Sequence, residues 1–149
     1  MRRIRSLRQL LRARGGSVII EFALLAPVMF MLMFGVFQVA IYVQNYNAVR
    51  SVVSDTARFV AVEYQKGNDL APLEIHAVMV SIATAAPYML DSDRLEIDIQ
   101  PVVTSRVAGA NEFSIDVDYT LESFLPFADL GAATLTYERP VFVVAPTAP

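Results

Sequence analysis

The sequence predicts an α+β protein with a long N-terminal transmembrane helix, an amphipathic helical stalk, a second short helix and a small antiparallel sheet of about three strands. Residues 22–43 carry no charge, and residues 44–66 contain neither proline nor glycine and keep apolar side chains at helical spacing. Apolar and polar residues alternate in the later segments, as in strands with one solvated face. We therefore divide the chain into a basic leader, a transmembrane helix, a stalk and a small extracytoplasmic α+β domain, over residues 1–16, 17–43, 44–66 and 67–149.

Charge is distributed unevenly along the 149 residues. Six of the twelve basic residues are arginines within the first 14 positions, where no acidic residue occurs, so residues 1–16 carry a charge of +6. The remaining residues hold six basic and fifteen acidic side chains, a net charge of −9. The high mean hydropathy of +0.46 argues against disorder and against a nucleic-acid-binding protein. The lack of cysteine excludes disulfides, zinc sites with thiolate ligands and thiol catalysis.

The uncharged stretch is long enough to cross a bilayer. At about 1.5 Å per residue its 22 residues span about 33 Å, close to the hydrocarbon thickness of about 30 Å. A cleavable secretory signal has a shorter apolar core of about 7–15 residues, so we expect a helix that stays in the membrane. The arginines before this helix predict a cytoplasmic N-terminus and an extracytoplasmic C-terminal domain.

The start of the apolar helix carries a distinctive pattern. A basic leader ends in Gly16, Glu21 follows as the fifth residue after it, and the same register continues with Phe22, Pro27 and Phe34-Gly35. This pattern resembles that of type IV prepilins. It is similar in particular to the TadE-like family, the minor pilins or pseudopilins of tight-adherence (Flp) pilus systems, and the resemblance implies a pilin-like fold.

The resemblance implies that a prepilin peptidase cuts between Gly16 and Ser17 and that Glu21 and Phe22 act in assembly and registry. It implies a single-pass protein of the bacterial inner membrane, with the pilus as a further location after processing. The implied partners are the prepilin peptidase, other pilins and pseudopilins, the inner-membrane pilus assembly platform and the lipid bilayer, with no nucleic acid. Many type IV pilins have phenylalanine directly after the cut, whereas this chain has Ser17, so we infer no N-methylation.

Glu21 lies at the edge of the apolar run, where an unpaired carboxylate is costly. Cleavage would create an ammonium at Ser17, four residues away and on the same helix face. Glu21 could pair with this ammonium or with that of a neighbouring subunit, which would set the axial register of the helices. The alternative is an interfacial carboxylate that reaches water or lipid headgroups.

Pro27 and Gly35 lie inside the apolar helix. Because Pro27 has no backbone N–H, we expect a kink or local melting there, either as a hinge or as a proline that the membrane helix tolerates. Gly35 also has two interpretations: a functional site of close helix packing, or a glycine that the membrane helix tolerates.

Two helices are expected in total. Residues 18–66 form one continuous helix, with Gly67 as its C-cap, and a second helix runs from about Pro72 to Ala86. Leu73, Ala77, Val80 and Ala83 are the positions expected to face the first helix. His76, the only histidine, is interpreted as a surface or half-buried side chain rather than as a metal ligand or base.

Three strands are expected, over residues 95–103, 113–122 and 134–144, with a hairpin connection at 106–111 and Pro140 at an edge or bulge. The first register considered pairs Leu95 with Leu121 and Asp98 with Asp118. A shift by two residues instead pairs Asp98 with Asp116, or Glu96 with Glu122.

Acidic side chains therefore face each other across the outer side of the sheet in each register. The simplest interpretation is a splayed, solvated face. Calcium binding is the alternative, with candidate ligands Asp98, Asp116 and Asp118, and docking to a basic partner is another. We predict no other metal site.

The sequence contains no nucleophile elbow, phosphate-binding glycine loop or HExxH motif. We therefore predict that the protein is not an enzyme and needs no cofactor. The prediction is a TadE-like minor pilin or pseudopilin, cut after Gly16, that acts in assembly of a tight-adherence pilus. The alternatives are an uncleaved single-pass envelope scaffold of the same system and a membrane-tethered ligand- or calcium-binding module.

Overall fold

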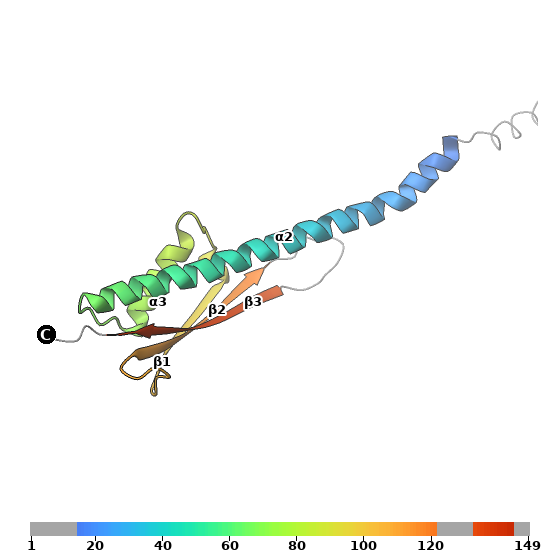
Figure 1. Ribbon diagram of the computed structural model, residues 1–149. Coiled ribbons are helices and arrows are strands. Elements are labelled where there is room, and N and C mark those ends of the chain that lie inside the picture. The colour runs from blue at the N-terminus through green and yellow to red at the C-terminus, as the bar shows by residue number, and fades with distance from the viewer. Residues whose placement is uncertain (1–14, 122–132, 145–149) are drawn as a thin grey trace, which may run out of the picture. The chain divides into compact units, whose positions relative to one another are not determined.

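The computed structural model describes residues 15–121 and 133–144 (Figure 1). The leader up to Arg14, the predicted strand end at Glu122 and the tail from Ala145 lie outside these residues. The elements in chain order are helix α2 (Gly15–Gln65), helix α3 (Pro72–Thr84), the 3-10 helix η1 (Ser92–Arg94), and strands β1 (Leu95–Val102), β2 (Asn111–Leu121) and β3 (Ala133–Val143). The predicted α+β class, with a long apolar helix, a second short helix and a three-stranded antiparallel sheet, is confirmed.

The chain divides into two compact units, one ending at Val39 and the other beginning at Ala40, and we describe each by itself. Helix α2 contributes to both. The finer division into leader, transmembrane helix, stalk and outer domain remains a prediction.

Helix α2 ends in a Schellman motif, as the glycine after it suggests. Gly67 has a positive φ of 85°, which only glycine adopts without strain. Its N–H donates to the carbonyl of Tyr64 at 3.0 Å, and the N–H of Asn68 donates to the carbonyl of Glu63 at 3.0 Å. The predicted C-cap at Gly67 is therefore confirmed.

Helix α3 begins at Pro72, as predicted, and the Glu74 carboxylate accepts a hydrogen bond from the N–H of Ala71 at 2.8 Å. The helix ends at Thr84, two residues earlier than expected, because Ala85 is already extended ahead of Ala86-Pro87. The buried positions of α3 are Ile75, Met79 and Ala83.

The apolar face predicted for this helix was wrong at Leu73 and Ala77, whereas Val80 is half-buried and Ala83 is buried. Leu73 is 79% exposed, and Ala77 is exposed as well. Both sets of residues have helical spacing, so periodicity alone did not distinguish the face that packs on the domain. His76 is half-buried, as expected.

The sheet is an antiparallel meander in the order β1-β2-β3. Leu95 pairs with Tyr119, Ile97 with Val117, and Asp98 with Asp116. The first register considered, Leu95 with Leu121, was therefore wrong, and the shift that pairs Asp98 with Asp116 is the observed one. A shift by two residues keeps the same side chains on each face, so alternation could not select between the registers.

The connection between β1 and β2 is longer than predicted, at residues 103–110. Pro140 lies in β3, which is an edge strand, as expected for a residue that cannot donate to a ladder.

The hydrophobic core of the second unit lies between the inner face of the sheet and the two helices. Helix α2 buries a stripe at helical spacing, including Val49, Val53 and Val60. The Tyr64 and Phe113 rings meet edge to face at 6.2 Å between centroids, as do Tyr46 and Tyr137 at 6.0 Å. These contacts position the polar outer face of the sheet away from α2.

Candidate functional site

The unit that ends at Val39 presents an apolar helical surface. Its side chains from Val18 onward are mostly exposed, and the most apolar 18-residue window of α2 is 0% buried. Within the described residues, α2 is the one helix long and apolar enough to cross a membrane. A helix of this length and composition, near the N-terminus and unburied, fits a single-pass membrane protein.

The residues of the predicted processing and assembly site lie on the first turns of α2. The backbone is helical at Gly16 and Ser17, the two residues of the predicted cut. Glu21 and Phe22 are exposed. Ser17 and Glu21 are four residues apart, so they share one helix face.

Glu21 makes no hydrogen bond or ion pair with any residue that the structure describes. It therefore adjoins the apolar surface with its carboxylate available for a partner outside the described part of the chain. This arrangement is compatible with both interpretations of Glu21, pairing and interfacial exposure.

Helix α2 continues through Pro27 without interruption, so the predicted local melting does not occur. Figure 1 shows a change of direction in the blue part of the helix. Apart from its chain neighbours and the adjacent backbone of the helix itself, no atom among the described residues comes within 4 Å of a Cβ placed on Gly35. Gly35 thus has open space beside it, and close packing there requires another molecule.

The outer face of the sheet brings the three candidate calcium ligands together. Asp98 and Asp116 are direct cross-strand partners, and Asp118 lies two residues further along β2. Hydrogen bonds already engage part of this oxygen set: Gln100 Nε2 donates to Asp98 Oδ2 at 2.7 Å, and Thr136 Oγ1 donates to Asp118 Oδ1 at 2.5 Å.

Two more carboxylates complete this outer acidic face. Glu96 pairs with Asp118 from β1, and Glu138 pairs with Asp116 from β3. Burial raises the pKa of Asp116, and the neighbouring charges of Glu138, Asp98 and Asp118 raise it further. Over residues 15–121 and 133–144, no three Asp, Glu, His or Cys side chains are arranged to hold a metal ion.

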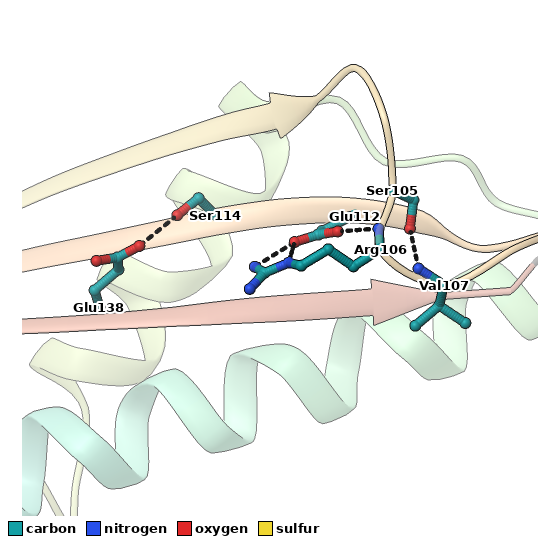
Figure 2. A network of polar contacts seen from close by, with 6 residues as sticks. All are labelled: Ser105, Arg106, Val107, Glu112, Ser114 and Glu138. Atoms are coloured by element: carbon teal, nitrogen blue, oxygen red, sulfur yellow. Dashed lines mark hydrogen bonds and ion pairs between the residues drawn. The ribbon is translucent and has the colours of Figure 1, made fainter.

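An ion pair between Arg106 and the buried Glu112, which the sequence did not predict, lies at the end of the same face (Figure 2). We call this pair the Arg106–Glu112 lock. The buried carboxylate of Glu112 accepts hydrogen bonds from Arg106 N at 2.8 Å and Arg106 Nε at 2.6 Å. Arg106 Nη2 also pairs with this carboxylate. These contacts lower the pKa of Glu112 and fold the connection between β1 and β2 over the start of β2.

Two further long-range contacts attach α2 to the rest of the domain. Tyr88 Oη donates to Asp55 Oδ2 at 2.7 Å, and Arg139 Nη1 donates to Ser54 Oγ at 2.6 Å. The partners are 33 and 85 residues apart in the sequence, so no local spacing signal could have found them.

Comparison with known proteins identifies one family. The model of the family described as TadE-like protein matches residues 16–58, a range that begins at the predicted cut and covers the apolar helix and most of the amphipathic part of α2. The resemblance seen in the sequence is therefore confirmed over this segment. Searches among curated proteins and among solved structures gave no match.

Proposed function

Since residues 16–58 are TadE-like, we propose that this protein is a minor pilin or pseudopilin of a tight-adherence (Flp) pilus system, cut by a prepilin peptidase after Gly16. A TadE-like segment indicates involvement in this pilus system in general. The position of Glu21 is the observation that supports the role of a cleaved minor pilin or pseudopilin. Glu21 lies at the start of an exposed apolar helix, one turn after Ser17, and has no partner among the described residues.

The proposed mechanism is assembly through α2. Before cleavage the leader adds a charge of +6 on the cytoplasmic side, and the helix is held across the inner membrane with the domain from residue 67 outside. Cleavage removes this charge and creates an ammonium at Ser17. The carboxylate of Glu21 then pairs with an ammonium, its own or that of a neighbouring pilin, because an unpaired carboxylate in hydrocarbon is costly.

Helix α2 packs on other pilin helices through its exposed apolar surface. Phe22 and the side chains around it bury against other pilin helices in the membrane, while the open space beside Gly35 admits a closely packed helix. The partners are the peptidase, the other pilins and pseudopilins, the assembly platform and the lipid bilayer. We propose a structural rather than an enzymatic role, since the matched family is associated with pili, and the role requires no cofactor.

N-terminal sequencing and intact mass of the protein coexpressed with a prepilin peptidase test the cut. We expect a mature chain that starts at Ser17 and lacks residues 1–16. Gly16→Val should block the cut because a branched side chain obstructs the backbone that the protease must reach. Gly15→Ala is the matched control and should still be processed.

An unchanged mass in the presence of active peptidase would overturn the cleavage step. The protein would then be the uncleaved single-pass scaffold of the same system, with Glu21 as an interfacial carboxylate.

A further inference from the structure

The described basic side chains of the second unit fall into two groups. Lys66 pairs with Glu63, Arg94 with Asp91, and Arg106 with Glu112. Arg50, Arg58 and Arg139 form no ion pair with any residue that the structure describes. Unpaired cations are unexpected in a chain whose residues 17–149 carry a net charge of −9.

These three arginines lie along one line. Arg50, Ser54 and Arg58 follow each other at intervals of four residues on one face of α2, and Arg139 reaches across from β3 to donate to Ser54 Oγ at 2.6 Å. The guanidinium of Arg139 is thus anchored between the other two. We call this line, Arg50, Arg139 and Arg58, the arginine seam. It extends over about 12 Å, the rise of eight helical residues.

The seam borders a groove of about 380 Å³. Its walls are Ala57 and Arg58 of α2 and residues 139–142 of β3, whose outer edge is not paired with any other strand in the part of the chain that the structure describes. Figure 2 shows α2 running beside β3. The half-buried Arg139 has the neutral hydroxyl of Ser54 as its hydrogen-bond partner, so most of its five N–H groups are left to donate to an anion.

The same domain carries a complementary row on its opposite side. Successive strand residues point to opposite faces, so Glu138 lies on the outer acidic face while its neighbour Arg139 faces α2. Asp98, Asp116 and Glu138 are direct partners across β1, β2 and β3. With strands about 4.8 Å apart, this acidic row extends over about 10 Å, close to the length of the seam.

We propose that the arginine seam of one copy binds the acidic row of a second copy. None of these six side chains forms an ion pair within the described part of the chain, although the charge of Arg106 acts on Glu138. The two lines of three charges match in length. Because the two surfaces differ, the contact is head to tail and extends into a chain of copies rather than closing as a two-fold dimer. This proposal names a partner for the assembly role proposed above and rests on that role.

The lack of cysteine in the chain allows a direct test with introduced thiols. Two differently tagged full-length copies are reconstituted together in phosphatidylcholine vesicles, one with Asn47→Cys beside the seam and the other with Thr136→Cys on the acidic face. Both positions are exposed. Under mild oxidation we expect a mixed disulfide between the two tags and far less product from either variant alone.

Charge reversal identifies the contact. Arg50→Glu with Arg58→Glu should lower the yield about tenfold or more, since like charges then face each other. Asp98→Lys with Asp116→Lys on the other copy should restore it. Lys66→Glu is the matched control, because Lys66 lies outside the seam, and it should leave the yield unchanged. Raising the salt from 0.15 M to 1 M should also weaken the contact, as the Debye length falls from about 8 Å to about 3 Å.

Several results would overturn the proposal. A mixed disulfide no more abundant than the same-variant products, or one that ignores both charge reversal and salt, would show that the two faces do not meet. If reversal of the seam instead alters binding to vesicles that contain phosphatidylglycerol and leaves the disulfide unchanged, the seam serves lipid phosphates. The intact mass reports leader cleavage separately, so failure of this contact and failure of the processing step are distinguishable.

Discussion

Arg106 holds a carboxylate that the fold removes completely from water. The side chain of Glu112 is 0% exposed although it lies on the polar side of β2, and Arg106 contacts it through both its backbone and its guanidinium. The guanidinium also lies 5.8 Å from the centroid of the Phe142 ring. Phe142 of β3 is the cross-strand partner of Glu112. One arginine therefore joins the connection after β1 to both β2 and β3.

The lock should release in acid. Hydrogen bonds from Arg106 lower the pKa of Glu112 below the usual glutamate value of 4.5, so its stabilising contribution is complete above that value. The contribution is lost as the pH falls through the lower pKa of the folded state. We expect the hydrogen-exchange protection factors of residues 105–107 to fall as the pH is lowered below the usual glutamate value of 4.5.

Glu112→Gln is the control for this release. It removes the titrating charge while keeping the shape, so the protection should be reduced at neutral pH and should no longer change over the acidic range. A variant with the same acid-dependent loss as the parent would assign that loss to another group.

Thr56 is a fully buried residue of α2 whose hydroxyl has no hydrogen-bond partner among the described residues. Burial of an unsatisfied hydroxyl is unfavourable, so Thr56→Val, which has nearly the same shape, should raise the free energy of unfolding by about 1 kcal/mol. Denaturant unfolding in detergent micelles, followed by circular dichroism, measures the change. Thr56→Ser keeps the hydroxyl and loses a methyl group, so it should destabilise the domain; equal effects of the two variants would contradict this explanation.

The ionised carboxylate of Asp116 should lower the free energy of unfolding at neutral pH. Its pKa is raised first by burial and then by Glu138, Asp98 and Asp118, so the folded state takes up a proton at a higher pH than the unfolded chain. The cost is present while Asp116 is ionised and is relieved as the pH falls through its raised pKa. Asp116→Asn should therefore stabilise the domain by roughly 0.5 kcal/mol at pH 7, a typical penalty for like charges across strands.

Thermal unfolding at pH 7 and below pH 3.8, the usual aspartate value, measures this difference. The gain from Asp116→Asn should shrink at the lower pH. Asp118→Asn is the matched comparison, and a smaller gain is expected because Asp118 accepts a hydrogen bond from Thr136. A gain from Asp116→Asn that does not depend on pH would point to a cause other than charge.

Glu21→Ala should leave membrane insertion intact and impair assembly. Removal of one carboxylate makes the apolar helix more hydrophobic, whereas it eliminates the partner for the ammonium of a neighbouring pilin. Membrane fractionation and co-purification with partner pilins measure the two effects, and Glu21→Asp should recover part of the co-purification. If the alanine variant co-purified normally, Glu21 would have no role in registry.

Local properties of the sequence determined the helices and the strand class. The uncharged run, the absence of proline and glycine over residues 44–66 and the glycine at position 67 predicted α2 and its end, because each acts on the nearby backbone. Strict alternation likewise predicted β2 with one apolar face. The pattern from Gly16 to Gly35 identified the TadE-like segment for the same reason: its information lies in adjacent residues.

The tertiary structure alone decided which surfaces meet. The face of α3 that packs, with Met79 inside and Leu73 outside, depends on where the rest of the domain lies. The pairing of Asp98 with Asp116 depends on the length of the 103–110 connection, since registers two residues apart keep the same alternation. The contact between Ser54 and Arg139, 85 residues apart, results from packing of the whole domain, and a sequence read in short windows carries no record of it.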